Sequence, residues 1–100
     1  MRKVHHLVLL KFRPGTPERT VAELFRALAD LRQSIPGIER FGGGPYSSPE
    51  GLNQGFTHGF VMTFASPAAR DGYLTHPDHE QVKLRFLPAV ENVIAFDFEE

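Results

Sequence analysis

Cysteine and tryptophan are absent from this chain, and so is any long run of apolar residues. Without cysteine there is no disulfide framework and no thiolate chemistry, which agrees with a cytoplasmic location. The apolar stretch Leu7–Leu10 is far shorter than the roughly 18 residues of a membrane span, and too short for the core of a secretion signal. We therefore expect a cytoplasmic protein that does not enter a membrane.

An excess of charge of one sign is lacking too. The 11 lysines and arginines nearly balance the 12 acidic residues, and the net charge of −1 argues against nucleic-acid binding. The 100 residues are 41% hydrophobic and contain no internal repeat or linker. This composition predicts a single globular domain over residues 1–100.

Alternating and helical spacings of apolar residues divide the chain into strands and helices. Strands are predicted at Val4–Phe12, Ile38–Phe41, Gly55–Phe64 and Asn92–Phe98. Helices are predicted after Thr16-Pro17, after Ser66-Pro67 and after a capping Asp78. The order predicts an α+β, ferredoxin-like βαββαβ subunit, a four-stranded antiparallel sheet with helices on one face.

The Gly42–Gly44 run lacks the Lys-Ser/Thr ending of a phosphate-binding loop and is expected to form a bend or bulge.

The sheet face away from the helices is predicted to be apolar. Its side chains would be Leu7, Leu9, Val61, Ile94, Phe96 and Phe98. Such a patch is large for a monomer, so we expect two copies to pack these faces together as a homodimer.

Polar side chains are predicted to gather on the opposite, helix-covered face. The stretch Tyr73–His79 packs a phenol, two imidazoles and a carboxylate into seven residues. Strand parity allows His6, His58 and Asp97 to face Tyr73 and His79. We expect these five residues to line one pocket for a small molecule, with Phe60, Met62 and Leu28 as its apolar walls.

Two interpretations of this cluster remain open. In the first, His79 is neutral near a helix N-terminus and acts as a general base oriented by Asp97, while Tyr73 stabilises an oxyanion. In the second, the same side chains satisfy one another in a structural core. His76 is expected in a turn or at the rim of the pocket. No His-x₃-His or Gly-x-Ser-x-Gly motif is present, so we expect neither a metal nor a cofactor nor a serine hydrolase.

The segments that carry these residues resemble the stress-responsive dimeric α/β-barrel (Dabb) family. The resemblance extends over VHHLVLLKF, IPGIERFGGG, GFTHGFVMTFASPAARDGYLTHPDHEQV and VIAFDF. It implies a ferredoxin-like subunit, a homodimer whose sheets form a barrel, and a pocket in each subunit. Some relatives resemble polyketide cyclases, which implies an aldol cyclisation with His79 as base, Asp97 orienting it and Tyr73 binding the carbonyl. The resemblance also implies that His6 and His58 line that pocket. Related monooxygenases share the barrel but use other residues, and the absence of tryptophan argues against that activity.

Three functions follow from the residues and the resemblance. The first is a dimer that binds a small apolar or aromatic molecule in connection with stress. The second is a cofactor-free acid–base enzyme acting on a carbonyl compound, as a cyclase, isomerase or lyase. The third is a purely structural stress protein whose stable assembly is its function.

Overall fold

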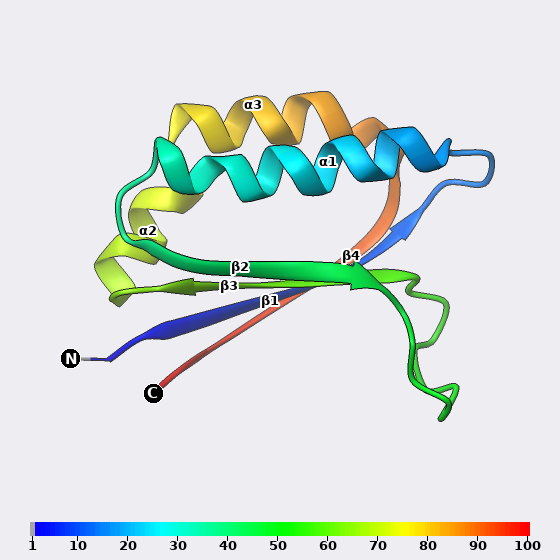
Figure 1. Ribbon diagram of the computed structural model, residues 1–100, viewed down its shortest axis with the longest axis horizontal. Helices are drawn as coiled ribbons and strands as arrows, with labels where there is room; N and C mark the ends of the chain where they lie inside the picture. The colour runs from blue at the N-terminus through cyan, green and yellow to red at the C-terminus, as the bar shows by residue number, and fades with distance from the viewer. Residues whose placement is uncertain (1) are drawn as a thin grey trace.

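The structure, a computed structural model, describes residues 2–100 and consists of a sheet with a layer of helices over it (Figure 1). Its elements are β1 (Val4–Phe12), α1 (Glu18–Asp30), η1 (Leu31–Gln33), β2 (Ile38–Pro45), β3 (His58–Phe64), α2 (Pro67–Leu74), α3 (Pro77–Phe86), η2 (Leu87–Ala89) and β4 (Val90–Glu99). All strand pairs are antiparallel, in the order β2-β3-β1-β4. The predicted ferredoxin-like subunit is therefore confirmed.

Helix starts follow the predicted chemistry at one of three positions. Ser66 caps α2 by accepting a hydrogen bond from the Ala69 amide at 3.1 Å. At α1 the N-cap is Pro17, because the Thr16 hydroxyl instead donates to the Arg13 carbonyl at 2.7 Å. At α3 the cap is His76, whose Nδ1 accepts from the Asp78 amide at 3.0 Å, so the predicted Asp78 cap was wrong.

The glycine run is regular strand rather than the expected bend. β2 continues through it to Pro45, and the irregular pairing with β3 lies earlier, between Ile38 and Arg40. Gly43 lies directly against the core: a Cβ there would meet Phe25 and Phe60 at 2.7 Å each. A side chain at this position would displace aromatic rings, so the strand needs glycine at Gly43 for packing.

The core lies between the helices and one face of the sheet. Met62, Phe64 and Val4 are fully buried on this face. From the helices, Leu24, Leu28 and Phe86 pack against them. The helical stripe and the strand alternation predicted from the sequence thus meet in one apolar layer.

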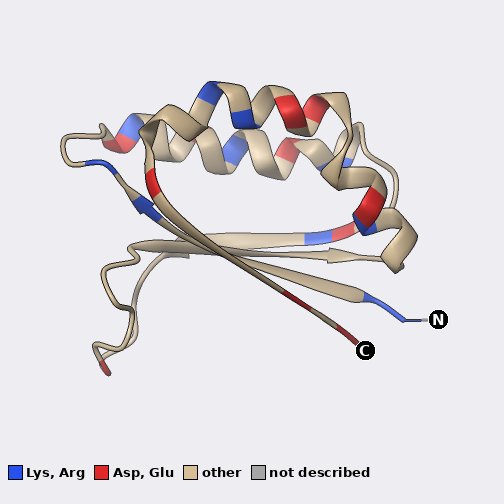
Figure 2. Cartoon of the chain, turned by 180° about the vertical axis from the view of Figure 1, so that it is seen from behind, with Lys and Arg blue, Asp and Glu red and all other residues tan. Residues whose placement is uncertain are grey.

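The opposite face of the sheet is apolar and uncovered. We call it the open face; its apolar side chains are Leu7, Leu9, Val61, Ile94, Phe96 and Phe98, and His5 and Thr63 lie at one end of the same face. Phe96 is 65% exposed, and Leu9, Ile94 and Phe98 are each more than two-fifths exposed. Charged residues concentrate on the helices and near the strand ends (Figure 2). Within residues 2–100, no helix has the length and apolar character needed to cross a membrane.

Candidate functional site

A cavity of about 280 Å³ lies between the sheet and α3; we call it the inner cavity. Five of the predicted site residues line it: His6, Leu28, Phe60, Tyr73 and His79. Most of the remaining wall is aliphatic or aromatic and includes Val8, Leu10, Leu24, Val82, Phe86, Val90, Val93 and Ala95. The cavity is therefore a mostly apolar space with two imidazoles, a phenol and the Lys83 side chain in its wall.

Tyr73 and His79 form a stacked pair at the junction of α2 and α3. Their ring centroids are 4.0 Å apart, with 24° between the planes. Tyr73 is 1% exposed and also packs against Phe64, at 5.1 Å between centroids. Pro77 begins α3 between them, and the His76 cap fixes the first turn that carries His79. The two rings are thus held by the local fold.

His79 has a buried nitrogen that is not satisfied. Its Nδ1 has no hydrogen-bond partner within residues 2–100. Burial of the ring lowers the pKa of His79, and the nearby Lys83 lowers it further. The backbone of Leu74 and Tyr73 opposes this shift without giving Nδ1 a hydrogen bond. His79 is therefore neutral at pH 7, and a side chain that lines the inner cavity carries a buried nitrogen without a hydrogen-bond partner.

Burial also favours the neutral form of Tyr73. Desolvation raises the pKa of its phenol well above the ordinary value of 10.0. The phenol therefore keeps its proton at physiological pH and can donate a hydrogen bond.

Asp97 is engaged with His6 rather than with His79. Its Oδ1 lies 2.5 Å from His6 Nδ1, and its Oδ2 accepts from the Arg70 guanidinium at 2.9 Å. The expectation that Asp97 orients His79 is not met, because the β1–β4 register sets His6 directly beside Asp97. Of the two imidazoles of the inner cavity, His6 is the one oriented by a carboxylate.

Arg70 was not predicted as part of this arrangement. On α2 it also contacts Asp71 at 2.7 Å, and in the sequence it resembles any charged residue on a solvated helix face. Burial raises the pKa of Asp97, but the hydrogen bonds from His6 and Arg70 outweigh that effect, and the net pKa is lowered. No feature of the sequence points to Arg70, because its contact with Asp97 joins α2 to β4 and depends on how the helix packs on the sheet.

Met62 does not contact the inner cavity. It is 0% exposed and pairs with His6 across β1 and β3, inside the core. Its predicted role as a ligand contact is corrected to a core position, because neighbouring side chains cover it completely.

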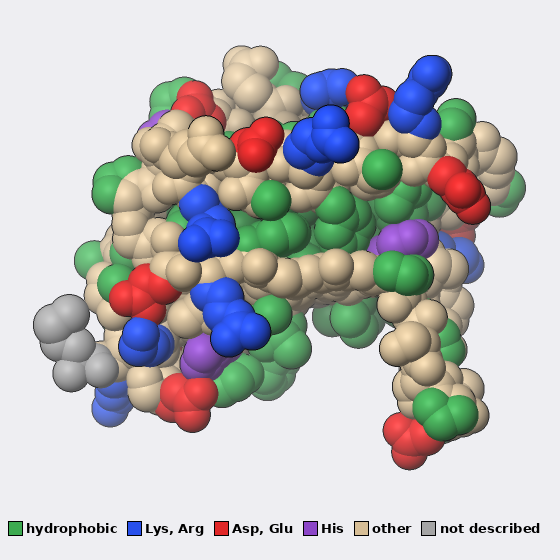
Figure 3. Space-filling model, viewed as in Figure 1, with side chains coloured by type: hydrophobic (Ala, Val, Ile, Leu, Met, Phe, Trp, Pro, Cys, Tyr) green, Lys and Arg blue, Asp and Glu red, His purple; other side chains and the backbone are tan. Residues whose placement is uncertain are grey.

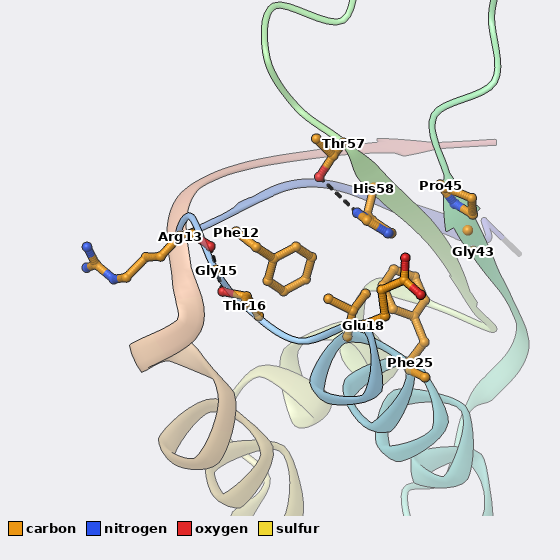
Figure 4. A pocket seen from close by; sticks show the side chains of 13 residues that line it. Phe12, Arg13, Gly15, Thr16, Glu18, Phe25, Gly43, Pro45, Thr57 and His58 are labelled. Carbon is orange, nitrogen blue, oxygen red and sulfur yellow. Dashed lines mark hydrogen bonds between the residues drawn. The ribbon is translucent and has the colours of Figure 1, made fainter.

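His58 lies in a different cavity, which corrects the prediction of one shared pocket. This outer cavity, of about 680 Å³, lies between the start of α1 and the end of β2. Phe12, His58 and Glu18 point into it from three elements, whereas Arg13 points away (Figure 4). Thr57 Oγ1 lies 2.9 Å from His58 Nδ1, and burial lowers the pKa of His58.

Neither cavity gathers metal ligands. Within residues 2–100, no group of three His, Cys, Asp or Glu side chains is placed to hold a metal ion.

Comparison with known proteins places this geometry in a family. The chain is 34% identical over 95 residues to stress-response A/B barrel domain-containing protein HS1 of Arabidopsis thaliana, covering 95% of this chain and 87% of HS1. It is 27% identical over 95 residues to olivetolic acid cyclase of Cannabis sativa, covering 95% and 94% of the two chains.

A solved structure gives the same result for the fold. A protein from Jannaschia, described as dimeric and ferredoxin-like, superposes with a TM-score of 0.86 at 26% identity, over 96% of this chain and 97% of that one. The model of the stress responsive A/B barrel domain, Dabb, matches residues 4–100. The chain therefore belongs to the Dabb family, as its sequence predicted.

Proposed function

We propose that the protein is a homodimer that binds a small apolar or aromatic compound in the inner cavity of each subunit. The observation that carries this proposal is an apolar cavity lined by His79, whose buried Nδ1 has no hydrogen-bond partner within residues 2–100. Buried polar atoms without partners are rare in folded proteins, and a ligand that hydrogen-bonds this nitrogen removes its desolvation cost.

The open face supports the homodimer. A sheet face with Phe96 65% exposed and three further large apolar side chains exposed is unfavourable in water. A second copy of the same face covers it with a self-complementary surface. The Jannaschia relative is described as dimeric, which agrees with this assembly.

The size and polarity of the inner cavity restrict its ligand. At about 280 Å³ it lies near the lower end of small-molecule pockets, which span about 300–1,000 Å³. Its aliphatic and aromatic wall suits an apolar body. Tyr73 donates a hydrogen bond and His79 Nδ1 pairs with a second polar group, so a ring or chain that bears a carbonyl or hydroxyl fits best.

A second candidate function is acid–base catalysis on a carbonyl compound without a cofactor. His79 is neutral, and its Nδ1 has no partner within residues 2–100. Tyr73 is a protonated phenol whose ring centroid lies 4.0 Å from that of His79, so a base and an oxyanion donor are adjacent. The relative named olivetolic acid cyclase supports a cyclase, and lyase or isomerase chemistry uses the same groups. In this chain Asp97 would assist through His6.

Native mass spectrometry of protein purified from its source tests the binding proposal, since it detects any compound that remains bound. We expect one small ligand per subunit, lost in His79→Phe, which keeps the stacked ring and removes Nδ1. Leu84→Ala is the matched control, because Leu84 is 71% exposed on the same helix. Absence of any ligand from the parent protein would favour the purely structural stress protein.

Turnover separates the two candidate functions. A binding protein loses affinity in Tyr73→Phe without showing product formation in any variant. An enzyme forms product from the identified ligand, and both Tyr73→Phe and His79→Phe slow this step. Unchanged binding and turnover in both variants would contradict both candidates.

The proposal also includes a cytoplasmic location and a role in the response to stress.

A further inference from the structure

The segment 46–57, which joins β2 to β3, projects from the body on the side of the open face (Figures 1 and 3). We call it the arm. The Tyr46 amide donates to the Thr57 carbonyl at 2.8 Å and ties the two ends of the arm together. The Thr57 amide donates to the Leu10 carbonyl at 3.0 Å and anchors the base to β1. Beyond this base the arm extends away from the rest of the subunit.

The arm holds its shape through its own hydrogen bonds. The Tyr46 hydroxyl accepts from the Gly51 amide at 2.8 Å. The Asn53 side chain donates to the Phe56 carbonyl at 2.8 Å, and the Phe56 amide returns a bond to the Asn53 carbonyl at 2.9 Å. These bonds hold the arm in a defined shape, although it extends away from the rest of the subunit.

The tip presents an apolar side chain. Leu52 is 73% exposed, and Glu50 is the only charged residue in the arm. At the base, a hollow of about 330 Å³ opens onto the open face between Leu9, Tyr46 and Phe56. The base of the arm and the open face thus border one hollow. In Figure 3 the arm, mostly polar with apolar side chains along it, hangs below the sheet on this side.

We propose that the arm is a clasp for a second copy of this chain, in which Leu52 packs on β4 of that copy beside Phe96. The inference rests on the proposed homodimer and adds the arm to its interface. The occupant is a second copy because the base of the arm shares a hollow with Leu9 of the open face, and the copy that covers this face comes within reach of the exposed Leu52.

The target within the second copy follows from the sheet order. The arm leaves from β2, one edge of the sheet, and β4 forms the other edge. A twofold axis that sets β2 of one copy against β4 of the other covers both unpaired edges and gives both arms a partner. Phe96 is the most exposed large apolar residue of β4, at 65%.

The lack of cysteine makes a crosslinking test clean. The double variant Leu52→Cys with Phe96→Cys is oxidised mildly and run on a non-reducing gel. We expect a covalent dimer that reduction dissolves, and little crosslinking in either single variant. Leu84→Cys with Phe96→Cys is the matched control, because Leu84 is similarly exposed, at 71%, but lies on α3. Circular dichroism confirms that each variant folds.

A second measurement does not depend on a disulfide. Leu52→Asp should weaken dimerisation by roughly tenfold or more in sedimentation, since it removes a buried apolar contact and adds a charge. Leu84→Asp should leave it unchanged. Both results together support the clasp.

Three results would overturn the inference. Efficient crosslinking of Phe96→Cys alone would mean that β4 meets β4. A stable dimer that neither crosslinks through Leu52 nor weakens in Leu52→Asp would refute the clasp and leave the homodimer standing. A folded monomer of the parent protein at micromolar concentration would refute the homodimer itself.

Discussion

Replacing Asp97 by asparagine tests the bridge between the sheet and α2. Asp97 accepts hydrogen bonds from two groups, His6 at 2.5 Å and Arg70 at 2.9 Å, and its side chain is 25% exposed. Asparagine keeps the shape but loses the charge, and its Nδ2 donates rather than accepts. One of the two hydrogen bonds is therefore lost, the other weakens, and Arg70 keeps only its exposed contact with Asp71. Hydrogen bonds to charged groups contribute about 1.5–3 kcal/mol, and we expect Asp97→Asn to lower the free energy of unfolding by that amount at pH 7.

The pH dependence of this loss has a definite sign. The pKa of Asp97 in the folded protein lies below its ordinary value of 3.8. The stability that its charge contributes is therefore present above that ordinary value and is lost as the pH falls through the folded pKa. The difference between parent and Asp97→Asn should stay constant from pH 7 to about pH 5 and shrink below about pH 4.

Urea unfolding followed by circular dichroism measures this difference, at one fixed protein concentration because dimerisation would add to stability. Asp71→Asn is the control: Asp71 also contacts Arg70, at 2.7 Å, but its side chain is 68% exposed. Its loss should cost less than about 1 kcal/mol. If Asp97→Asn were as mild as Asp71→Asn at pH 7, or kept its full effect at pH 3, the bridge would not stabilise the fold as described.

Two further substitutions probe the packing and the inner cavity. Gly43→Ala should lower the free energy of unfolding by about 1–3 kcal/mol, because its Cβ would meet Phe25 and Phe60 at 2.7 Å. Gly44→Ala, whose Cβ would have nothing within 4 Å, should be nearly neutral in the same urea assay. Equal effects of the two substitutions would contradict this account of β2. His79→Phe should remove a pH dependence, since the pKa of His79 is lowered in the folded protein and the parent therefore loses stability as the pH falls below about 6.5. The gap between parent and variant should shift in favour of His79→Phe from pH 7 to pH 5, and a constant gap would argue against a buried, neutral His79.

Strand parity could be predicted from the sequence because side chains alternate strictly along a strand. His6, Asp97 and Phe60 do lie on the helix-covered face, and Phe96 and Phe98 do lie on the open one. The alternation predicts on which face of the sheet a side chain lies. It does not predict which residues of adjacent strands are neighbours. That second property is the register, which depends on how the turns and the core fit together.

The register explains why the five predicted residues do not form one site. His6 pairs with Met62, and His58 pairs with Leu10, four residues further along β1. Four residues of strand span about 13 Å, so His58 shares the face of His6 but lies too far along it to share a small cavity. The same register sets His6 beside Asp97, which assigns the carboxylate to His6 rather than to His79.

Aromatic packing then keeps the two cavities apart. Phe60 lines the inner cavity, Phe25 lines the outer one, and their rings meet at 6.3 Å between centroids and 89° between planes. A ligand in the inner cavity therefore reaches His6, Tyr73 and His79 but meets Phe60 before it reaches His58. The helix-covered face of the sheet thus carries more polar side chains than a single ligand in the inner cavity can contact. In this chain the polar groups that line the cavity of a single bound molecule are two imidazoles, a phenol and the Lys83 side chain, and Phe60 limits the length of that molecule.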